Sequence, residues 1–79
     1  MDPDRQLVRL AKSGNKSAFG KLARRYRDKV LALAYDFLKD YESAKDVAQD
    51  VFMKAFKNIG DFEEKSKFFV DLLIILLDG

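Results

Sequence analysis

Three polar side chains, Asp46, Gln49 and Asp50, stand at positions i, i+3 and i+4, which share one patch of a helix surface. Two carboxylates with an amide between them can accept paired hydrogen bonds from the arginine side chains of a partner. A charged outer face is more often only solvated, and Asp50 with Lys54 is an ordinary i, i+4 pair worth about 0.2–0.5 kcal/mol. The spacing alone therefore leaves both interpretations open.

Histidine and cysteine are both absent from the 79 residues. Their absence excludes disulfides, thiolate nucleophiles, histidine acid–base chemistry and zinc sites of the usual composition. The remaining Asp, Glu, Lys, Tyr and Ser residues form no recognisable catalytic motif and no carboxylate-rich metal loop. We therefore expect a protein that is not an enzyme and that uses no cofactor and no metal.

Charge is unevenly distributed along the chain, although the net charge is only +2. Residues 1–39 contain ten Lys and Arg against four Asp and Glu, whereas residues 40–79 contain five Lys against nine Asp and Glu. This asymmetry predicts two electrostatically different faces and, with them, two different partners. One basic group could contact a phosphate backbone or could simply be solvated: Arg24, Arg25, Arg27 and Lys29.

The elements that carry these residues are predicted to be helices, because apolar residues recur at steps of three and four. We predict an all-α fold in one domain over residues 1–79, a compact bundle with short connections that favour antiparallel neighbours. The four predicted helices cover about residues 3–13, 16–39, 41–59 and 66–77. The apolar stripe of the second helix extends as far as Phe37 and Leu38.

Capping residues mark the ends of the predicted helices. Asp2-Pro3, Asn15 and Asp40 are expected to begin the first three helices. Gly14 and Gly60 are expected to end the first and the third. Residues 61–67 are then left as a charged loop before the fourth helix.

Residues 68–79 are atypical, because apolar side chains surround the predicted helix and only Asp71 interrupts them. The segment is too short to span a bilayer, which needs about 20 residues. It could be the centre of the core, an interface with another protein or an altered sequence without a selected role, and Ile74-Ile75 leaves a strand open. We predict a homo-oligomer, most simply a dimer. The predicted contact residues are Leu73, Ile74, Leu76 and Leu77.

Several separated segments agree in order and spacing with one known family. They are residues 7–14, 18–22, 25–30 and 46–56, the last of which reads DVAQDVFMKAF. Over roughly residues 4–68 the chain resembles region two of bacterial RNA polymerase sigma factors of the extracytoplasmic-function group. The resemblance implies a cytoplasmic helical domain that docks on a coiled coil of the polymerase β′ subunit and that recognises and opens the promoter minus-ten element.

The resemblance assigns these two activities to different residues. Polymerase docking is assigned to Asp46, Gln49, Asp50 and Met53. Leu31 and Tyr35 of the preceding helix are implied to flank this surface. Because the family's coiled coil is rich in Arg, carboxylates suit it. Promoter contact is assigned to the loop residues Phe62, Lys65, Ser66 and Lys67.

The promoter-contacting part departs from the family pattern. Glu63-Glu64 stands where the family often has Arg-Gly, and Asp71 stands at a Trp position. Leu73 and Ile74 replace Tyr and Arg. Repulsion from phosphates and the loss of base stacking should both weaken promoter binding.

Two functions remain. The first is a sigma-like domain that binds the polymerase core and contributes to minus-ten recognition. The alternative is a degenerate interaction module that binds the core or an anti-sigma factor, or associates with itself through the last helix, without reading a promoter. Neither involves a membrane. A complete factor would also carry a domain for the minus-thirty-five element, so the chain is expected to be a fragment or a stand-alone version.

Overall fold

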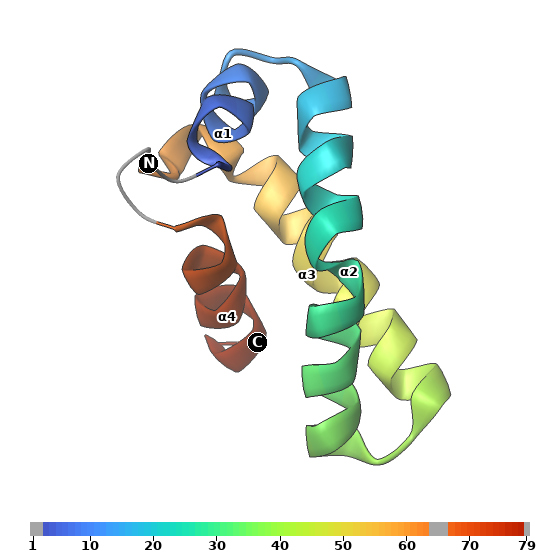
Figure 1. Ribbon diagram of the computed structural model, residues 1–79. Helices are drawn as coiled ribbons and strands as arrows, with labels where there is room; N and C mark the ends of the chain where they lie inside the picture. Colours follow the sequence, from blue (N-terminus) through green and yellow to red (C-terminus); the bar gives the residue numbers. More distant parts are fainter. Residues whose placement is uncertain (1–2, 64–66, 79) are drawn as a thin grey trace.

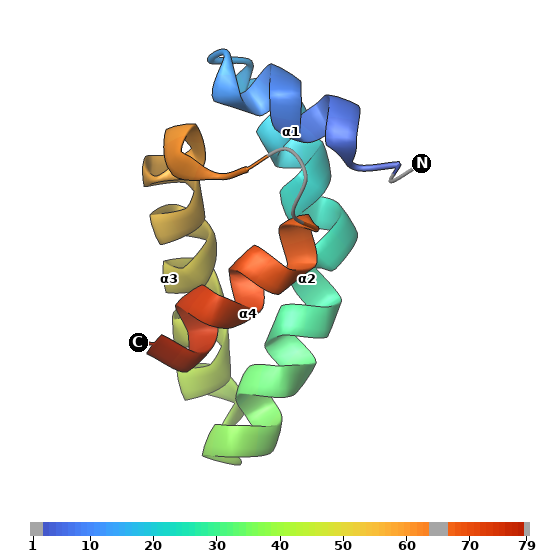
Figure 2. The same ribbon diagram turned by 90° about the vertical axis from the view of Figure 1, so that its left-hand side faces the viewer.

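The computed structural model describes residues 3–63 and 67–78, which form four α-helices and one short 3-10 helix. In chain order these are α1 (Arg5–Lys12), α2 (Lys16–Leu38), α3 (Tyr41–Lys57), η1 (Ile59–Asp61) and α4 (Phe68–Asp78). α2 and α3 run antiparallel, and α1 packs against one end of this pair (Figure 1). α4 crosses one face of the pair (Figure 2). The predicted all-α fold of four helices is confirmed, and the strand alternative for Ile74-Ile75 is wrong.

The connection between α2 and α3 consists of two residues, Lys39 and Asp40. Lys39 ends α2 in the left-handed conformation, with φ of 59°. Asp40 then caps α3, and its carboxylate accepts hydrogen bonds from the Ser43 hydroxyl at 2.6 Å and the Ser43 backbone N–H at 3.0 Å. These two hydrogen bonds, the hydroxyl first, lower the pKa of Asp40. Asn15 caps α2 in the same way, accepting from the N–H of Ala18 at 3.0 Å.

Two helix boundaries differ from the sequence expectation. Asp4, rather than Asp2-Pro3, occupies the position before α1, although its side chain makes no capping hydrogen bond; Asp2 lies outside the described residues. Gly60 lies within η1 and does not end α3. α3 ends at Lys57, and the side chain of the C-cap residue Asn58 donates a hydrogen bond to the carbonyl oxygen of Lys54 at 3.0 Å.

The core lies where α1, α2, α3 and α4 meet. Its buried residues are Val8, Ala11, Ala18, Phe19, Leu22, Val30, Ala48, Val51, Ala55, Ile59, Phe62, Phe68 and Leu72. Phe68 is the hub, because its ring lies 5.8–6.0 Å from the rings of Phe19, Tyr26 and Phe62. Ala55 of α3 is fully buried in this core.

The last turn of α2 is more exposed than its apolar pattern predicts. Phe37 is 66% exposed and Leu38 is 44% exposed. Figure 1 shows the reason: α4 ends well before the turn between α2 and α3, so none of the other described helices covers this end of the pair. The predicted apolar stripe is therefore buried as far as Ala34 and exposed over its last turn.

A buried carboxylate connects α1 to α2. Asp4 is 3% exposed, and its two oxygens accept hydrogen bonds from the Arg25 guanidinium and the Tyr26 phenol. The Tyr26 ring also stacks on Phe69 of α4, with 5.5 Å between the ring centres. Lys29 Nζ lies 5.8 and 5.6 Å from the centres of these two rings. One contact network therefore holds three helices in register.

Candidate functional site

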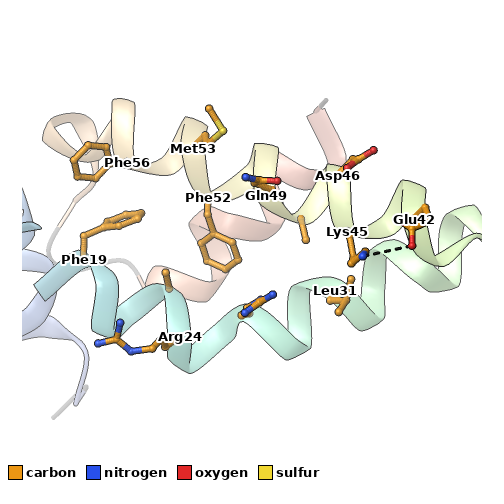
Figure 3. A pocket seen from close by; sticks show the side chains of 13 residues that line it. Phe19, Arg24, Leu31, Glu42, Lys45, Asp46, Gln49, Phe52, Met53 and Phe56 are labelled. Atoms are coloured by element: carbon orange, nitrogen blue, oxygen red, sulfur yellow. Dashed lines mark ion pairs between the residues drawn. The ribbon is translucent and has the colours of Figure 1, made fainter. Parts of the chain in front are cut away.

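A groove of about 650 Å³ runs between α2 and α3, on the side of the pair away from α4 (Figure 3). It is lined from α2 by Phe19, Ala23, Arg24, Arg27 and Leu31, and from α3 by Glu42, Lys45, Asp46, Ala48, Gln49, Phe52, Met53 and Phe56. The α3 residues recur at three- and four-residue steps, so they occupy one side of that helix. Two of the lining residues, Phe19 and Ala48, also belong to the core, so the groove reaches down to the core between the two helices.

The floor of the groove is apolar and only partly buried. The rings of Phe19 and Phe56 meet edge to face, with 5.1 Å between their centres. Phe56 is nevertheless 44% exposed and Met53 is 63% exposed, while Phe52 is half-buried. Apolar side chains exposed together in this way are typical of a surface that binds another protein.

Three of the four predicted docking residues line this groove. Asp46, Gln49 and Met53 contribute to its α3 wall, and Figure 3 shows them along one side of that helix. Asp50 is not a lining residue, and its carboxylate forms the expected ion pair with Lys54 at 3.0 Å.

The two residues expected to flank the docking surface separate in the same way. Leu31 lines the groove between α2 and α3. Tyr35, which is 44% exposed, does not line the groove, but it borders a shallow depression that Leu31 and Tyr41 also line.

The predicted promoter residues are only partly described. Lys65 and Ser66 lie outside the described residues, and Lys67 is exposed. Phe62 is only 9% exposed; its ring packs 5.8 Å from that of Phe68, and its carbonyl oxygen accepts a hydrogen bond from Lys12. Burial of an aromatic ring is strongly favourable, so in this conformation Phe62 belongs to the core and does not face solvent.

Asp71 places a carboxylate against the apolar interior. Its Oδ2 atom is buried and has no hydrogen-bond partner among residues 3–63 and 67–78. Burial raises the pKa of Asp71, and the negative charge of Glu63 raises it further. The ionised form therefore opposes folding at neutral pH.

Asp71→Asn should raise the free energy of unfolding by about 1 kcal/mol at pH 7, because it removes the charge while keeping the shape. Because the pKa of Asp71 is raised in the folded state, the native protein binds more protons than the unfolded chain at pH values between the two pKa values. The loss of stability caused by the Asp71 charge therefore grows as the pH rises from 3.8 through the pKa of the folded state. Urea unfolding at pH 4 and pH 7 measures the difference. A gain that is equal at both pH values would contradict this account.

α4 exposes a stripe of apolar side chains. Leu73 and Leu76, two of the predicted self-association residues, are half-buried. Ile74 and Leu77, the other two, are 59% and 70% exposed. Val70 continues the same stripe at 46%. Within the part of the chain that the structure describes, no helix combines the length and hydropathy that crossing a membrane requires.

The sequence did not indicate which residues of α2 line the groove opposite α3. The sequence left Arg24 and Arg27 as residues that could contact a phosphate backbone or simply be solvated, and the structure places both along the groove opposite α3. Phe52 and Phe56 also line the groove: Phe52 packs against the core and is half-buried, whereas Phe56 is 44% exposed. One signal could have revealed this, because Phe52, Met53 and Phe56 make the apolar face of α3 wider than packing on α2 alone requires.

Comparison with known proteins places these features in a family. Residues 22–70 match the model of the family described as Sigma-70 region 2. The chain is 38% identical over 77 residues to the RNA polymerase sigma-H factor of Pseudomonas aeruginosa, covering 98% of this chain and 40% of that protein. It is 34% identical over 61 residues to the ECF RNA polymerase sigma factor SigW of Bacillus subtilis, covering 77% of this chain and 33% of that protein.

A solved structure agrees closely in three dimensions. It is an NMR structure of an engineered region 2 of sigmaE in complex with GTAAAA, with a TM-score of 0.88 and 31% sequence identity. The match covers 95% of this chain and 78% of that one. The chain spans two fifths or less of the length of the two curated relatives named above. From the family match and the shared fold, this chain belongs to the Sigma-70 region 2 family.

Proposed function

We propose that this chain binds the RNA polymerase core through the groove between α2 and α3 and contributes to recognition of the promoter minus-ten element in transcription initiation. The observation that carries the proposal is the acidic and amide wall of Asp46 and Gln49 above an exposed apolar floor. Membership of the family and the sigma-factor relatives support it. The function is that of a binding protein in the cytoplasm and not of an enzyme.

The chemistry of the wall suits an arginine-rich helix such as those of the β′ coiled coil. The Asp46 carboxylate can accept two hydrogen bonds from one guanidinium, and the neighbouring Gln49 amide can accept a third. Met53 supplies an apolar contact that adapts to the partner's shape. Asp50, which is paired with Lys54, contributes through its charge at the edge of this contact.

Reversing the charge of the wall should abolish most of the binding. Asp46→Arg is expected to weaken the affinity for purified polymerase core at least about tenfold, because it places a cation against the partner's arginines. Asp36→Arg is the matched control: it is the same substitution at an exposed site of α2 that does not line the groove. Fluorescence anisotropy of labelled domain measures both, and equal affinity of Asp46→Arg and wild type would refute docking at this groove.

For the promoter strand we propose weak binding near Phe62 and Lys67. The similar structure is described as a complex with GTAAAA, which supports strand binding by a domain of this fold. The acidic side chain of Glu63 is exposed beside Phe62 and should repel phosphates. Glu63→Gln is therefore expected to strengthen binding of a GTAAAA oligonucleotide a few-fold at low salt. If neither form binds the strand while the core is bound, the chain is an interaction module without promoter reading.

Self-association through α4 is a further proposal. Val70, Ile74 and Leu77 lie at helical spacing and are exposed, which supports an apolar contact between two copies. Sedimentation at micromolar concentration should detect a dimer, and Ile74→Glu should return it to monomer. A monomer in the wild-type protein would end this proposal. An anti-sigma factor is the other partner that such a surface could bind.

A further inference from the structure

The two walls of the groove between α2 and α3 carry opposite charge. Arg24 and Arg27 line it from α2, whereas Asp46 and Gln49 line it from α3. In Figure 3 Arg24 and Asp46 belong to opposite sides of the groove. Within the described part of the chain, the guanidinium groups of Arg24 and Arg27 form no ion pair, and the Asp46 carboxylate forms none either. These charges are therefore available to a partner.

The other charged pair of the groove does not cancel this polarity. Glu42 and Lys45, which also line the α3 wall, form an ion pair with each other at 3.4 Å. Lys45 in addition lies 5.1 Å from the ring centre of Tyr41. Because these two charges neutralise one another, the α3 wall remains negative through Asp46 and the α2 wall remains positive.

The shape of the groove fits one helix. Its α2 wall extends from Phe19 to Leu31, which is about 18 Å at 1.5 Å per residue, or about three turns. Two side-by-side helices present a channel in which a third helix packs at about 8–10 Å. An apolar floor with charged edges is the arrangement that binds the apolar face of an amphipathic helix.

We propose that the groove selects the direction of one amphipathic helix of the polymerase core, whose acidic edge lies along Arg24 and Arg27 and whose basic edge lies along Asp46 and Gln49. Turning such a helix end for end, with its apolar face still on the floor, exchanges its two edges. The reversed helix would place cations against Arg24 and Arg27 and anions against Asp46, which is unfavourable. The inference rests on the proposed function, because it takes the core as the partner.

The test compares two double charge reversals on α2. Arg24→Glu with Arg27→Glu reverses the groove wall, and Lys16→Glu with Lys21→Glu reverses two exposed cations that do not line the groove. Both change the net charge equally, so long-range attraction changes by a similar amount. The groove variant is expected to bind purified polymerase core at least tenfold more weakly than wild type in fluorescence anisotropy, and the control less than threefold. Circular dichroism checks that both remain helical.

Each other outcome overturns the inference. Equal weakening by the two double variants would mean that only net charge matters, and no weakening by Arg24→Glu with Arg27→Glu would remove α2 from the contact. If Asp46→Arg weakens binding while the α2 groove variant does not, the inference fails and the proposed function stands. If neither variant changes binding, or the wild-type domain does not bind the core, the proposed function fails as well.

Discussion

Phe68→Ala is expected to lower the free energy of unfolding by about 3–5 kcal/mol, the usual loss when a fully buried phenylalanine is truncated. Phe68 is 1% exposed, and its ring meets three other rings from α2 and the segment after η1. A domain of this size has a total stability of about 4–12 kcal/mol. The substitution therefore removes a large part of it, and urea unfolding measures the change.

Two control variants separate the loss of the buried Phe68 ring from the general effect of removing a phenylalanine. Phe68→Leu keeps much of the apolar volume, so it should lose clearly less stability and remain folded even if the alanine variant does not. Phe37→Ala removes the same ring from a site that is 66% exposed and should change stability by less than about 1 kcal/mol. Equal losses for Phe68→Ala and Phe37→Ala would contradict the assignment of Phe68 as the centre of the core.

Asp4→Ala is expected to lower the free energy of unfolding by about 2–3 kcal/mol. The carboxylate is buried, and its removal leaves the Tyr26 phenol and the Arg25 guanidinium without this acceptor. The loss stays below that of a fully buried ion pair because the Arg25 side chain is 45% exposed. Thermal and urea unfolding measure it.

The contributions at this site can be separated. Tyr26→Phe keeps the ring stacked on Phe69 and removes only the phenol, so it should lose about half as much as Asp4→Ala. In the double variant the two losses should not add, because both substitutions remove the same hydrogen bond. A variant Asp4→Ala as stable as the wild type would show that this carboxylate does not hold α1 to α2.

Local features of the fold could be predicted from the sequence. Asn15 and Asp40 were identified as caps because their side chains act within three residues, and both make the expected hydrogen bonds. The helix over 41–59 was predicted from periodicity and ends within about two residues of the observed end of α3. Features of this kind depend only on neighbours along the chain.

Features that depend on several elements could not be predicted. Asp4 finds its partners 21 and 22 residues away in α2, and no periodic pattern records that contact. Phe62 was assigned to a loop surface, yet it packs against Phe68, since the chain's path after η1 decides its position. The exposure of Phe37 depends on how far α4 extends across α2, which residue types alone do not specify.

The candidate site shows the same division. Asp46, Gln49 and Met53 were placed on one face because they share a helix, and all three line the groove. The positive wall formed by Arg24 and Arg27 depends on the rotation of α2 against α3, which tertiary packing determines. The opposite charges of the two groove walls therefore follow from how α2 and α3 pack, which the sequence pattern of either helix alone does not specify.

The most direct measurement of the central claim is the binding of this domain to purified RNA polymerase core, with and without a GTAAAA-containing non-template oligonucleotide. We expect the domain to form a complex with the core alone, and the oligonucleotide to bind this complex more tightly than it binds either protein separately. Analytical ultracentrifugation with a labelled domain and a differently labelled oligonucleotide follows both steps. A domain that remains unbound at micromolar concentrations of core would contradict the account.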